Sequence, residues 1–234
     1  MSDAKGPRRY ESPKRRQQAR ATRRHIVEAG RSLFLSRGYG GTTIEAIAGE
    51  AGVAVQTVYA VFGSKPHILK TVLDVDVSGE DAPAPLLDPE AVEALGREPE
   101  PGRRVRMFAA LVGDAQGRTA AVAQVAREAA AADPEVAQMW RVMQASRAEA
   151  MAEAARSLVG NGSPARPLEE ICDLLWVLCS PEVHQLFVAE RLWTPERYQE
   201  WLVSAIGPLV APGGPADQAG TTGVIRRPSD ENFS

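Results

Sequence analysis

The sequence has little cysteine, few aromatic residues and no long apolar run. Its 234 residues include two cysteines, and aromatic residues make up 6%. Cys172 and Cys179 form no CxxC pair, which argues against a disulfide framework and a zinc finger. The longest strongly apolar run, residues 174–179, is far shorter than the ~20 residues that a membrane-spanning helix needs. The first residues are polar, with no apolar signal segment, so we expect a cytoplasmic protein with no membrane partner.

Charge is divided unevenly along the chain. Residues 1–75 contain 13 basic and 6 acidic side chains, whereas residues 76–234 contain 14 and 24, which leaves a net charge of −3. A basic front on an acidic body indicates that the front meets a polyanion. Chance clustering on a solvated surface is the alternative interpretation. The abundance of alanine and arginine, with only four lysines, is typical of a GC-rich bacterial genome.

Helical patterns near the N-terminus are separated by tight turns. An apolar stripe at helical spacing predicts a first helix over residues 18–37. Thr42 and Glu45 have the spacing of a capping box at the start of the next helix. Gly52 ends that helix, and residues 54–62 form another. Two short helices joined by a glycine turn have helix-turn-helix geometry, in which the second helix enters the major groove of DNA.

The rest of the chain also has helical patterns. We expect helices over residues 101–117, 118–131, 134–159, 168–179, 181–191 and 195–210. Proline between a capping residue and an acid marks helix starts at Pro134 and Pro195. Ser180-Pro181 is either a third start or a kink in one longer helix. The fold is therefore predicted to be all-α, with about nine to ten helices: a three-helix DNA-binding domain and a larger helical domain.

Short motifs in the first part of the chain occur in a fixed order. They are GY-x-x-TT-x-x-x-IA at 38–48, AGV at 51–53, TVY at 57–59 and F-x-SK at 62–65. With them, residues 26–73 resemble the DNA-binding domain of the TetR/AcrR-type transcriptional repressors. The resemblance implies a homodimer, a ligand-binding helical body and repression that a small molecule relieves. The sequence departs from the family pattern at Ala54, Gln56 and Val61, and Ala54 replaces the usual serine cap of the second helix.

The expected contacts with a double-stranded DNA operator lie on and around the second helix of the motif. By matching positions, Thr43, Thr57, Tyr59 and Lys65 resemble the family's backbone contacts, and Gln56 and Thr57 lie near bases. Glutamine can bond adenine edges, and threonine can contact a thymine methyl group. The full set of DNA-binding candidates is Thr42, Thr43, Val55, Gln56, Thr57, Tyr59 and Lys65.

The helical body offers candidates for an effector site and for a dimer interface. Methionine and tryptophan form adaptable apolar walls. We expect a small hydrophobic effector to contact Met107, Leu111, Trp140, Met143 and Trp176. Residues 174–202 resemble the dimerisation helices of many bacterial family members. The apolar stripe of the last helix predicts that Leu202 and Ile206 lie at a two-fold seam, unless the stripe packs only within the subunit.

No catalytic site, metal site or cofactor is expected. The chain contains no GxGxxG, P-loop, HExxH or GxSxG motif. Cys172 and Cys179 share a helix face and are either buried structural residues or redox sensors. His184 is interpreted as a core histidine rather than a metal ligand. Two other functions stay open: an activator or architectural DNA binder without a ligand, and an all-α enzyme that uses Cys179 and His184.

These observations divide the chain into five expected segments. They are a disordered basic arm (1–16), a helix-turn-helix DNA-binding domain (17–75), a connecting segment (76–100), a helical effector-binding and dimerisation domain (101–210) and a disordered tail (211–234). The tail is rich in glycine and proline and carries too little apolar surface to offset ordering entropy. The proline-rich connecting segment is expected to contain one short helical turn around Pro89–Leu95.

Overall fold

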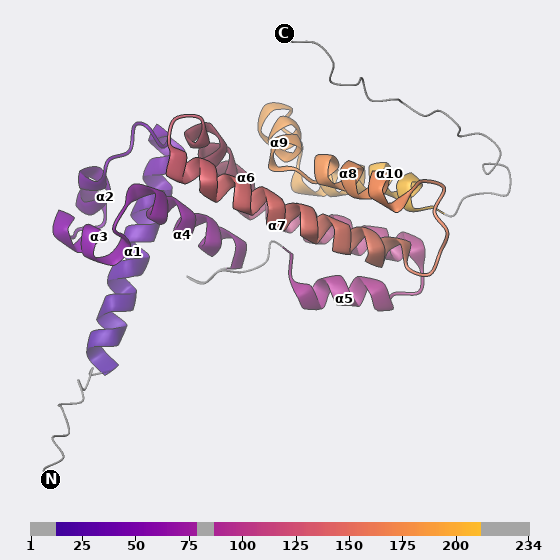
Figure 1. Ribbon diagram of the computed structural model, residues 1–234, viewed down its shortest axis with the longest axis horizontal. Coiled ribbons are helices and arrows are strands. Elements are labelled where there is room, and N and C mark those ends of the chain that lie inside the picture. Colours follow the sequence, from indigo (N-terminus) through magenta and orange to yellow (C-terminus); the bar gives the residue numbers. More distant parts are fainter. Residues whose placement is uncertain (1–12, 79–86, 212–234) are drawn as a thin grey trace, which may run out of the picture.

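Helices make up most of the part of the chain that the structure describes, residues 13–78 and 87–211 of a computed structural model (Figure 1). They are α1 (Pro13–Arg37), α2 (Ile44–Glu50), α3 (Val55–Phe62), α4 (Lys65–Ser78), α5 (Pro89–Arg97), α6 (Pro101–Ala130), α7 (Pro134–Val159), α8 (Leu168–Leu178), α9 (Pro181–His184), a π-helical segment (Gln185–Glu190) and α10 (Pro195–Val210). No strand occurs within these residues. The all-α prediction is confirmed.

The predicted helix starts at Pro134, Pro181 and Pro195 are confirmed, each with a side-chain cap. The carboxylate of Asp133 accepts from two backbone N–H groups of the first turn of α7, at 3.0 and 3.3 Å. The hydroxyl of Ser180 accepts from the third residue of α9 at 3.2 Å. The helix ending at residue 178 therefore stops before Pro181, and the two segments meet at a bend of 46°.

Two predicted boundaries are wrong. Residues 101–117 and 118–131 form the single helix α6, because the exposed Gly117 lacks the steric and hydrogen-bonding faults by which proline stops a helix. Helix α1 begins at Pro13, so residues 13–16 of the expected arm are helical. The remainder of that arm, residues 79–86 of the connecting segment and residues 212–234 of the tail lie outside the described residues.

The first hydrophobic core joins the N-terminal helices to one end of α6 and α7. Its largest fully buried side chains from α1, α2 and α4 are Ile26, Phe34, Ile47, Ile68, Leu69 and Leu73. The C-terminal end of α6 and the first turn of α7 contribute Val122, Ala126, Ala129 and Val136 to the same core. Helices α1 and α4 approach closely at Gly30, where an added Cβ would lie 2.8 Å from the side chain of Ile68.

The second core fills the other end of the molecule, between α5, α6, α7, α8 and α10. Tyr198, Leu202 and Ile206 of α10 are fully buried there, within one subunit. The prediction that Leu202 and Ile206 form a two-fold seam is therefore wrong. One face of α10 packs against the other helices of its own subunit, and Leu202 and Ile206 lie on that face.

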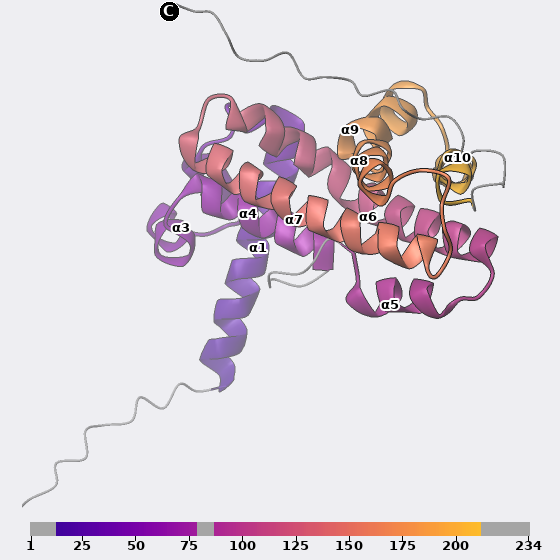
Figure 2. The ribbon, with the colours of Figure 1, turned by 45° about the vertical axis from the view of Figure 1, so that its right-hand side comes forward.

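The long helices α6 and α7 run side by side along the molecule. Helix α5 lies on one side of this pair and α8, α9 and α10 lie on the other (Figures 1 and 2). The N-terminal helices gather at the end where α6 turns into α7, and the first turns of α1 project away from all other helices (Figure 2). The tertiary structure thus places a small head at the α6–α7 turn of a larger helical body.

Candidate nucleic-acid interface and ligand cavity

Helices α2 and α3 pack through one face each and meet at a tight turn. Gly52 has a φ of +67°, in the left-handed region that glycine adopts without strain. The backbone N–H of Val53 donates to the carbonyl of Ala48 at 3.0 Å, which closes the turn. Val58 and Phe62 anchor α3 in the first core. The opposite face of α3 is consequently held outward by a rigid support.

The outward face of α3 carries most of the predicted base-reading residues. Gln56 is exposed, Thr57 is half-buried, and half of the surface of Tyr59 is exposed. Val55, in contrast, is half-buried and packs against the first core. Helix α3 begins without a side-chain cap, because Ala54 offers no hydroxyl. The absence of the cap does not prevent the helix, since its apolar face provides the tertiary support.

The two threonines before α2 have different roles. The N-cap is Thr43, whose hydroxyl accepts from the backbone N–H of Ala46 at 3.1 Å. The predicted capping box from Thr42 is therefore wrong by one residue. Thr42 is fully buried, and its hydroxyl donates to the carbonyl of Gly38 at 2.8 Å. Its side chain faces the core, whereas the side chain of Thr43 is exposed.

Lys65 connects the start of α4 to the loop after α1. Its ammonium donates to the carbonyl oxygens of Tyr39 and Thr42, at 2.9 and 3.0 Å, and lies 3.9 Å from the centre of the Tyr39 ring. Partial burial lowers the pKa of Lys65, and the nearby carboxylate of Asp133 opposes that shift. Lys65 therefore has a structural role that its sequence motif alone did not reveal.

Tyr39 connects the head to the body. Its hydroxyl donates to Asp133 at 2.6 Å, at the turn between α6 and α7. This hydrogen bond holds the pKa of Asp133 below its usual range, whereas burial and the carboxylate raise the pKa of Tyr39. A second link joins the hydroxyl of Ser64 to Glu135 at 3.2 Å. The loop after α1 and the α3–α4 connection are thereby both fixed to the start of α7.

Basic side chains cover the projecting start of α1. Lys14, Arg15, Arg20 and Arg24 are exposed, and no acidic residue lies in the first turn. The charge distribution predicted that the basic N-terminal part of the chain meets a polyanion. That basic surface includes the start of α1, which extends beyond the head.

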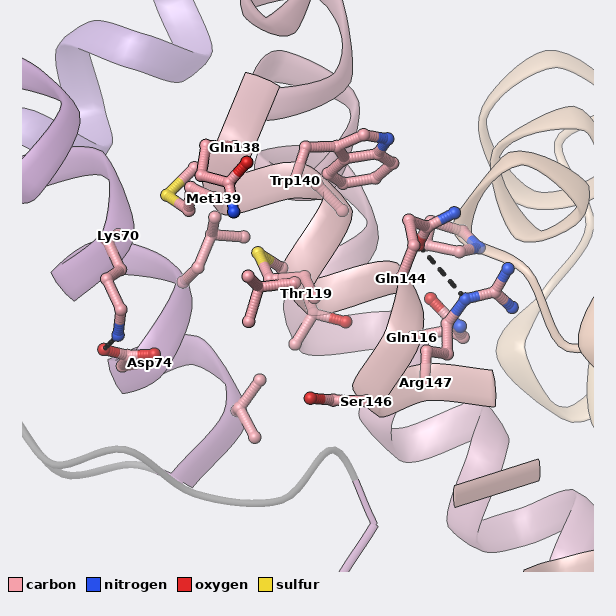
Figure 3. Close-up of a pocket in the computed structure, with 16 residues that line it drawn as sticks. Lys70, Asp74, Gln116, Thr119, Gln138, Met139, Trp140, Gln144, Ser146 and Arg147 are labelled. Carbon is pink, nitrogen blue, oxygen red and sulfur yellow. Dashed lines mark hydrogen bonds and ion pairs between the residues drawn. The ribbon is translucent and has the colours of Figure 1, made fainter. Parts of the chain in front are cut away.

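A cavity of about 400 Å³ lies between α4, α6 and α7 (Figure 3). Two of the predicted effector residues, Trp140 and Met143, line it. Met107 and Leu111 pack instead against the second core, so their prediction as wall residues of this cavity is wrong. Trp176 does not line the cavity either. Its ring lies 4.3 Å from the guanidinium of Arg147, and Arg147 does line the cavity. Helical spacing alone could not tell the second core from the cavity wall.

Sequence analysis missed the polar residues of the cavity. These are Lys70, Asp74, Gln116, Thr119, Gln138, Gln144, Ser146 and Arg147. Gln116 and Thr119 are nearly fully buried on a helix face that is otherwise apolar. Two polar residues three positions apart on an apolar stripe were a usable signal, because buried polar groups need partners.

The two cysteines and His184 show no sign of reactivity. Burial raises the pKa of Cys179 to about 12 and lowers the pKa of His184, so neither group favours its charged form. Burial also raises the pKa of Cys172. A reactive cysteine needs the opposite shift. Within the described residues, no group of three His, Cys, Asp or Glu side chains could hold a metal ion.

No single helix of the described chain is long and apolar enough to cross a membrane. Helix α8 and the segment from Pro181 to Glu190 pass that test only as a bent pair, by length and composition.

The head is a helix-turn-helix unit, with α3 as its outward helix, on an all-α body that encloses a cavity. Residues 26–72 match the model of the family described as bacterial regulatory proteins, tetR family. This match shows a tetR-type DNA-binding domain in the head and supports a TetR-type transcriptional regulator. Among curated proteins, no sequence matches significantly.

Solved structures of bacterial regulators share the fold over most of this chain. A transcriptional regulator from Rhodococcus sp. Rha1 is 18% identical, with a TM-score of 0.59 over 80% of this chain and 95% of that one. A TetR-family regulator from Mesorhizobium loti is 19% identical, with a TM-score of 0.60 over 82% and 96%. NalD, the secondary repressor of the MexAB-OprM multidrug efflux pump in Pseudomonas aeruginosa, is 20% identical, with a TM-score of 0.61 over 81% and 95%. These likenesses show the fold.

We expect Lys65→Ala to lower the free energy of unfolding by about 1–3 kcal/mol, because two carbonyl oxygens lose their donor. Urea denaturation measures the change. The control is Lys70→Ala, on the same helix, which removes an ion pair between partly exposed groups. Its effect should be under about 1 kcal/mol. Equal stability of the two variants would show that the Lys65 hydrogen bonds carry no net free energy.

Proposed function

We propose that the protein is a homodimeric repressor that binds a DNA operator and is released from it by a small apolar effector. The observation that carries the proposal is the position of α4. This helix packs in the core of the helix-turn-helix head, and its second half lines the cavity through Lys70, Leu73, Asp74 and Val77. One rigid helix therefore contacts both the DNA-binding unit and the ligand site. A DNA target places this action in the bacterial cytoplasm.

The DNA contacts divide into base-reading and phosphate-binding groups. Gln56 and Thr57 face the major groove and read base edges, and Val55, which packs against the first core, contributes at most through its backbone at the start of α3. Tyr59 and Thr43 are exposed and contact the phosphate backbone, and the third ammonium hydrogen of Lys65 is available to a phosphate. Thr42 contributes through its backbone, because its side chain is buried. The basic residues at the start of α1 add phosphate contacts outside the groove.

The dimer interface lies on α8 and the π-helical segment. Within the described residues, eight large apolar side chains are exposed, and five of them fall between residues 168 and 192. These five are Leu168, Trp176, Val177, Leu186 and Leu192. Apolar side chains concentrated in one segment are typical of a protein–protein interface. A two-fold axis there would bury this surface against its own copy.

Effector binding lowers DNA affinity by linkage. The two recognition helices of a dimer read half-sites about 34–36 Å apart. An effector held between α4 and α7 favours the position of α4 that fits it best. If that position changes the spacing of the two α3 helices, the effector and the operator oppose each other by an equal coupling free energy.

A DNA selection with the purified dimer tests the proposal. We expect one palindromic operator, bound with an affinity that falls as salt rises. The slope of log K against log salt should be about −0.9 for each phosphate neutralised. A slope near zero, or the absence of any preferred sequence, would contradict the DNA-binding assignment.

Gln56→Ala should relax the base preference at one position of each half-site by about 1–3 kcal/mol. The amide loses its paired hydrogen bonds to a base edge, while the phosphate contacts are unchanged. The same selection, repeated with this variant, provides the measurement. The control is Ala60→Ser, an exposed change on the same helix that removes no contact. If Gln56→Ala returns the parental preferences, Gln56 reads no base.

Val177→Glu should give a folded monomer with weak operator binding. Half of the surface of Val177 is exposed, so the carboxylate is solvated in one subunit but meets its own copy at a two-fold seam. The contrasting variant Leu202→Glu should instead lose the fold, because Leu202 is fully buried. Light scattering and thermal unfolding distinguish the outcomes. A Val177→Glu variant that stays dimeric would remove this part of α8 from the interface.

A further inference from the structure

The end of the cavity nearest α8 contains an amide that is only half satisfied. The Nε2 atom of Gln116 donates to the carbonyl of Cys179 at 2.6 Å. The Oε1 atom of the same amide is buried and has no hydrogen-bond partner. Only 2% of the surface of Gln116 is exposed. A buried acceptor without a donor is costly, and natural proteins retain few of them.

The direction of this amide follows from its one hydrogen bond. Because the nitrogen is turned toward Cys179 at the end of α8, the oxygen lies on the other side of the amide. Figure 3 shows Gln116 on the α6 wall of the cavity, beside Arg147 and across from Lys70 and Asp74. The unused acceptor therefore lies just beneath the cavity wall, at the end that is farthest from the Lys70–Asp74 ion pair, and has almost no accessible surface.

The neighbouring hydroxyl has its donor in use. The Oγ1 atom of Thr119 donates to the carbonyl of Ala115 at 2.8 Å, and 4% of the surface of Thr119 is exposed. A hydroxyl whose hydrogen is committed can still accept. Thr119 and Gln116 thus both present acceptors at this end of the cavity. What they lack is a donor.

A buried positive charge stands next to these acceptors. Arg147 is 5% exposed, and its guanidinium donates to the carbonyl of Trp176 at 2.6 Å and to the side chain of Gln144 at 3.3 Å. Among the described residues, no carboxylate lies within ion-pair distance of it. Burial lowers the pKa of Arg147, and the charge of Glu182 opposes that shift. Lys70 is already paired with Asp74, so a cationic ligand next to Arg147 would meet an unpaired positive charge and be disfavoured.

The remaining wall is apolar and adaptable. It is formed by Leu73, Val77, Ala123, Met139, Trp140 and Met143, among others. A volume of about 400 Å³ accommodates a molecule of two fused rings or a chain of similar size. Such a wall accepts many shapes, so specificity comes from the few polar groups.

We infer that this cavity selects apolar molecules that carry a hydrogen-bond donor, such as a phenolic or alcoholic hydroxyl, directed at Oε1 of Gln116, and that it rejects apolar cations. The inference rests on the proposed effector role of the cavity. The ligand hydroxyl satisfies the unpaired amide oxygen, while its apolar body fills the space between α4 and α7.

Paired probes test the inference on the full-length protein without DNA. The probes are 2-naphthol, 2-methylnaphthalene, 2-methoxynaphthalene and the cation 2-naphthylmethylammonium, with affinities measured by calorimetry. We expect the wild-type protein to bind 2-naphthol about tenfold more tightly than either neutral analogue. The methoxy compound can accept but not donate, so it isolates the donor. The cation should not bind.

A double-mutant cycle then assigns the preference to Gln116. Gln116→Met should reduce the tenfold preference for 2-naphthol over 2-methylnaphthalene to about one. Loss of the hydrogen bond to Cys179 affects the affinities of both probes for this variant equally, so it cancels in their ratio. Gln138→Met, at an exposed position of the same cavity, is the control and should keep the preference. The wild-type comparison of 2-naphthol with its methoxy analogue decides the matter if Gln116→Met fails to fold.

Three results would overturn the inference. They are an unchanged preference in Gln116→Met, equal wild-type affinity for 2-naphthol and 2-methoxynaphthalene, and no binding of any neutral probe. Operator release is measured separately by adding 2-naphthol to the DNA complex. Selective binding without release would leave the ligand chemistry standing and contradict the proposed repressor mechanism. Release of the operator by probes that show no preference for a hydrogen-bond donor would support the repressor mechanism and contradict the proposed ligand chemistry.

Discussion

The packing of α4 is the constraint on which the rest of the structure depends. Ile68, Leu69 and Val72 of this helix are fully buried, and the helix packs against α1, α3, α6 and α7. The hydrophobic core therefore does not divide where the helix-turn-helix sequence ends. A head that shares its core with the body cannot swing freely, so any movement of α4 is transmitted to α3 through close-packed side chains.

Polar contacts fix α4 near both ends and set its direction. Near its start, Lys65 donates to two backbone carbonyl oxygens, one of them from Tyr39, which itself bonds Asp133. Near its end, the guanidinium of Arg31 bonds Asp76 at 2.9 Å. Burial raises the pKa of Asp76, and Arg31 opposes that shift. Such partly buried pairs add orientation more than stability, because desolvation offsets much of the Coulomb attraction.

The polar residues of the cavity connect it to α8. Gln116 and Arg147 both donate to carbonyl oxygens at the C-terminal end of that helix, where backbone acceptors have no helical partner. The same helix presents Trp176 and Val177 to the surface. The residues that would meet an effector are thus one hydrogen bond away from the segment that we assign to the dimer interface. A ligand hydroxyl bound to the free oxygen of Gln116 would therefore act on both α4 and α8.

The sequence by itself determined the helical fold, the helix-turn-helix unit and the starts of α7, α9 and α10, because caps, prolines and glycine turns act over three or four residues. It could not decide which of two adjacent threonines caps α2, since both have a suitable hydroxyl. The folded chain decides it, because the hydroxyl of Thr42 donates to the carbonyl of Gly38 and that of Thr43 is left to cap the helix. It also could not separate wall from core: Met107 and Met143 have the same pattern, but one packs in the second core and the other lines the cavity. Only the tertiary structure brought Gln116 to the end of α8 and buried Leu202 within the subunit, because those contacts join residues far apart in the chain.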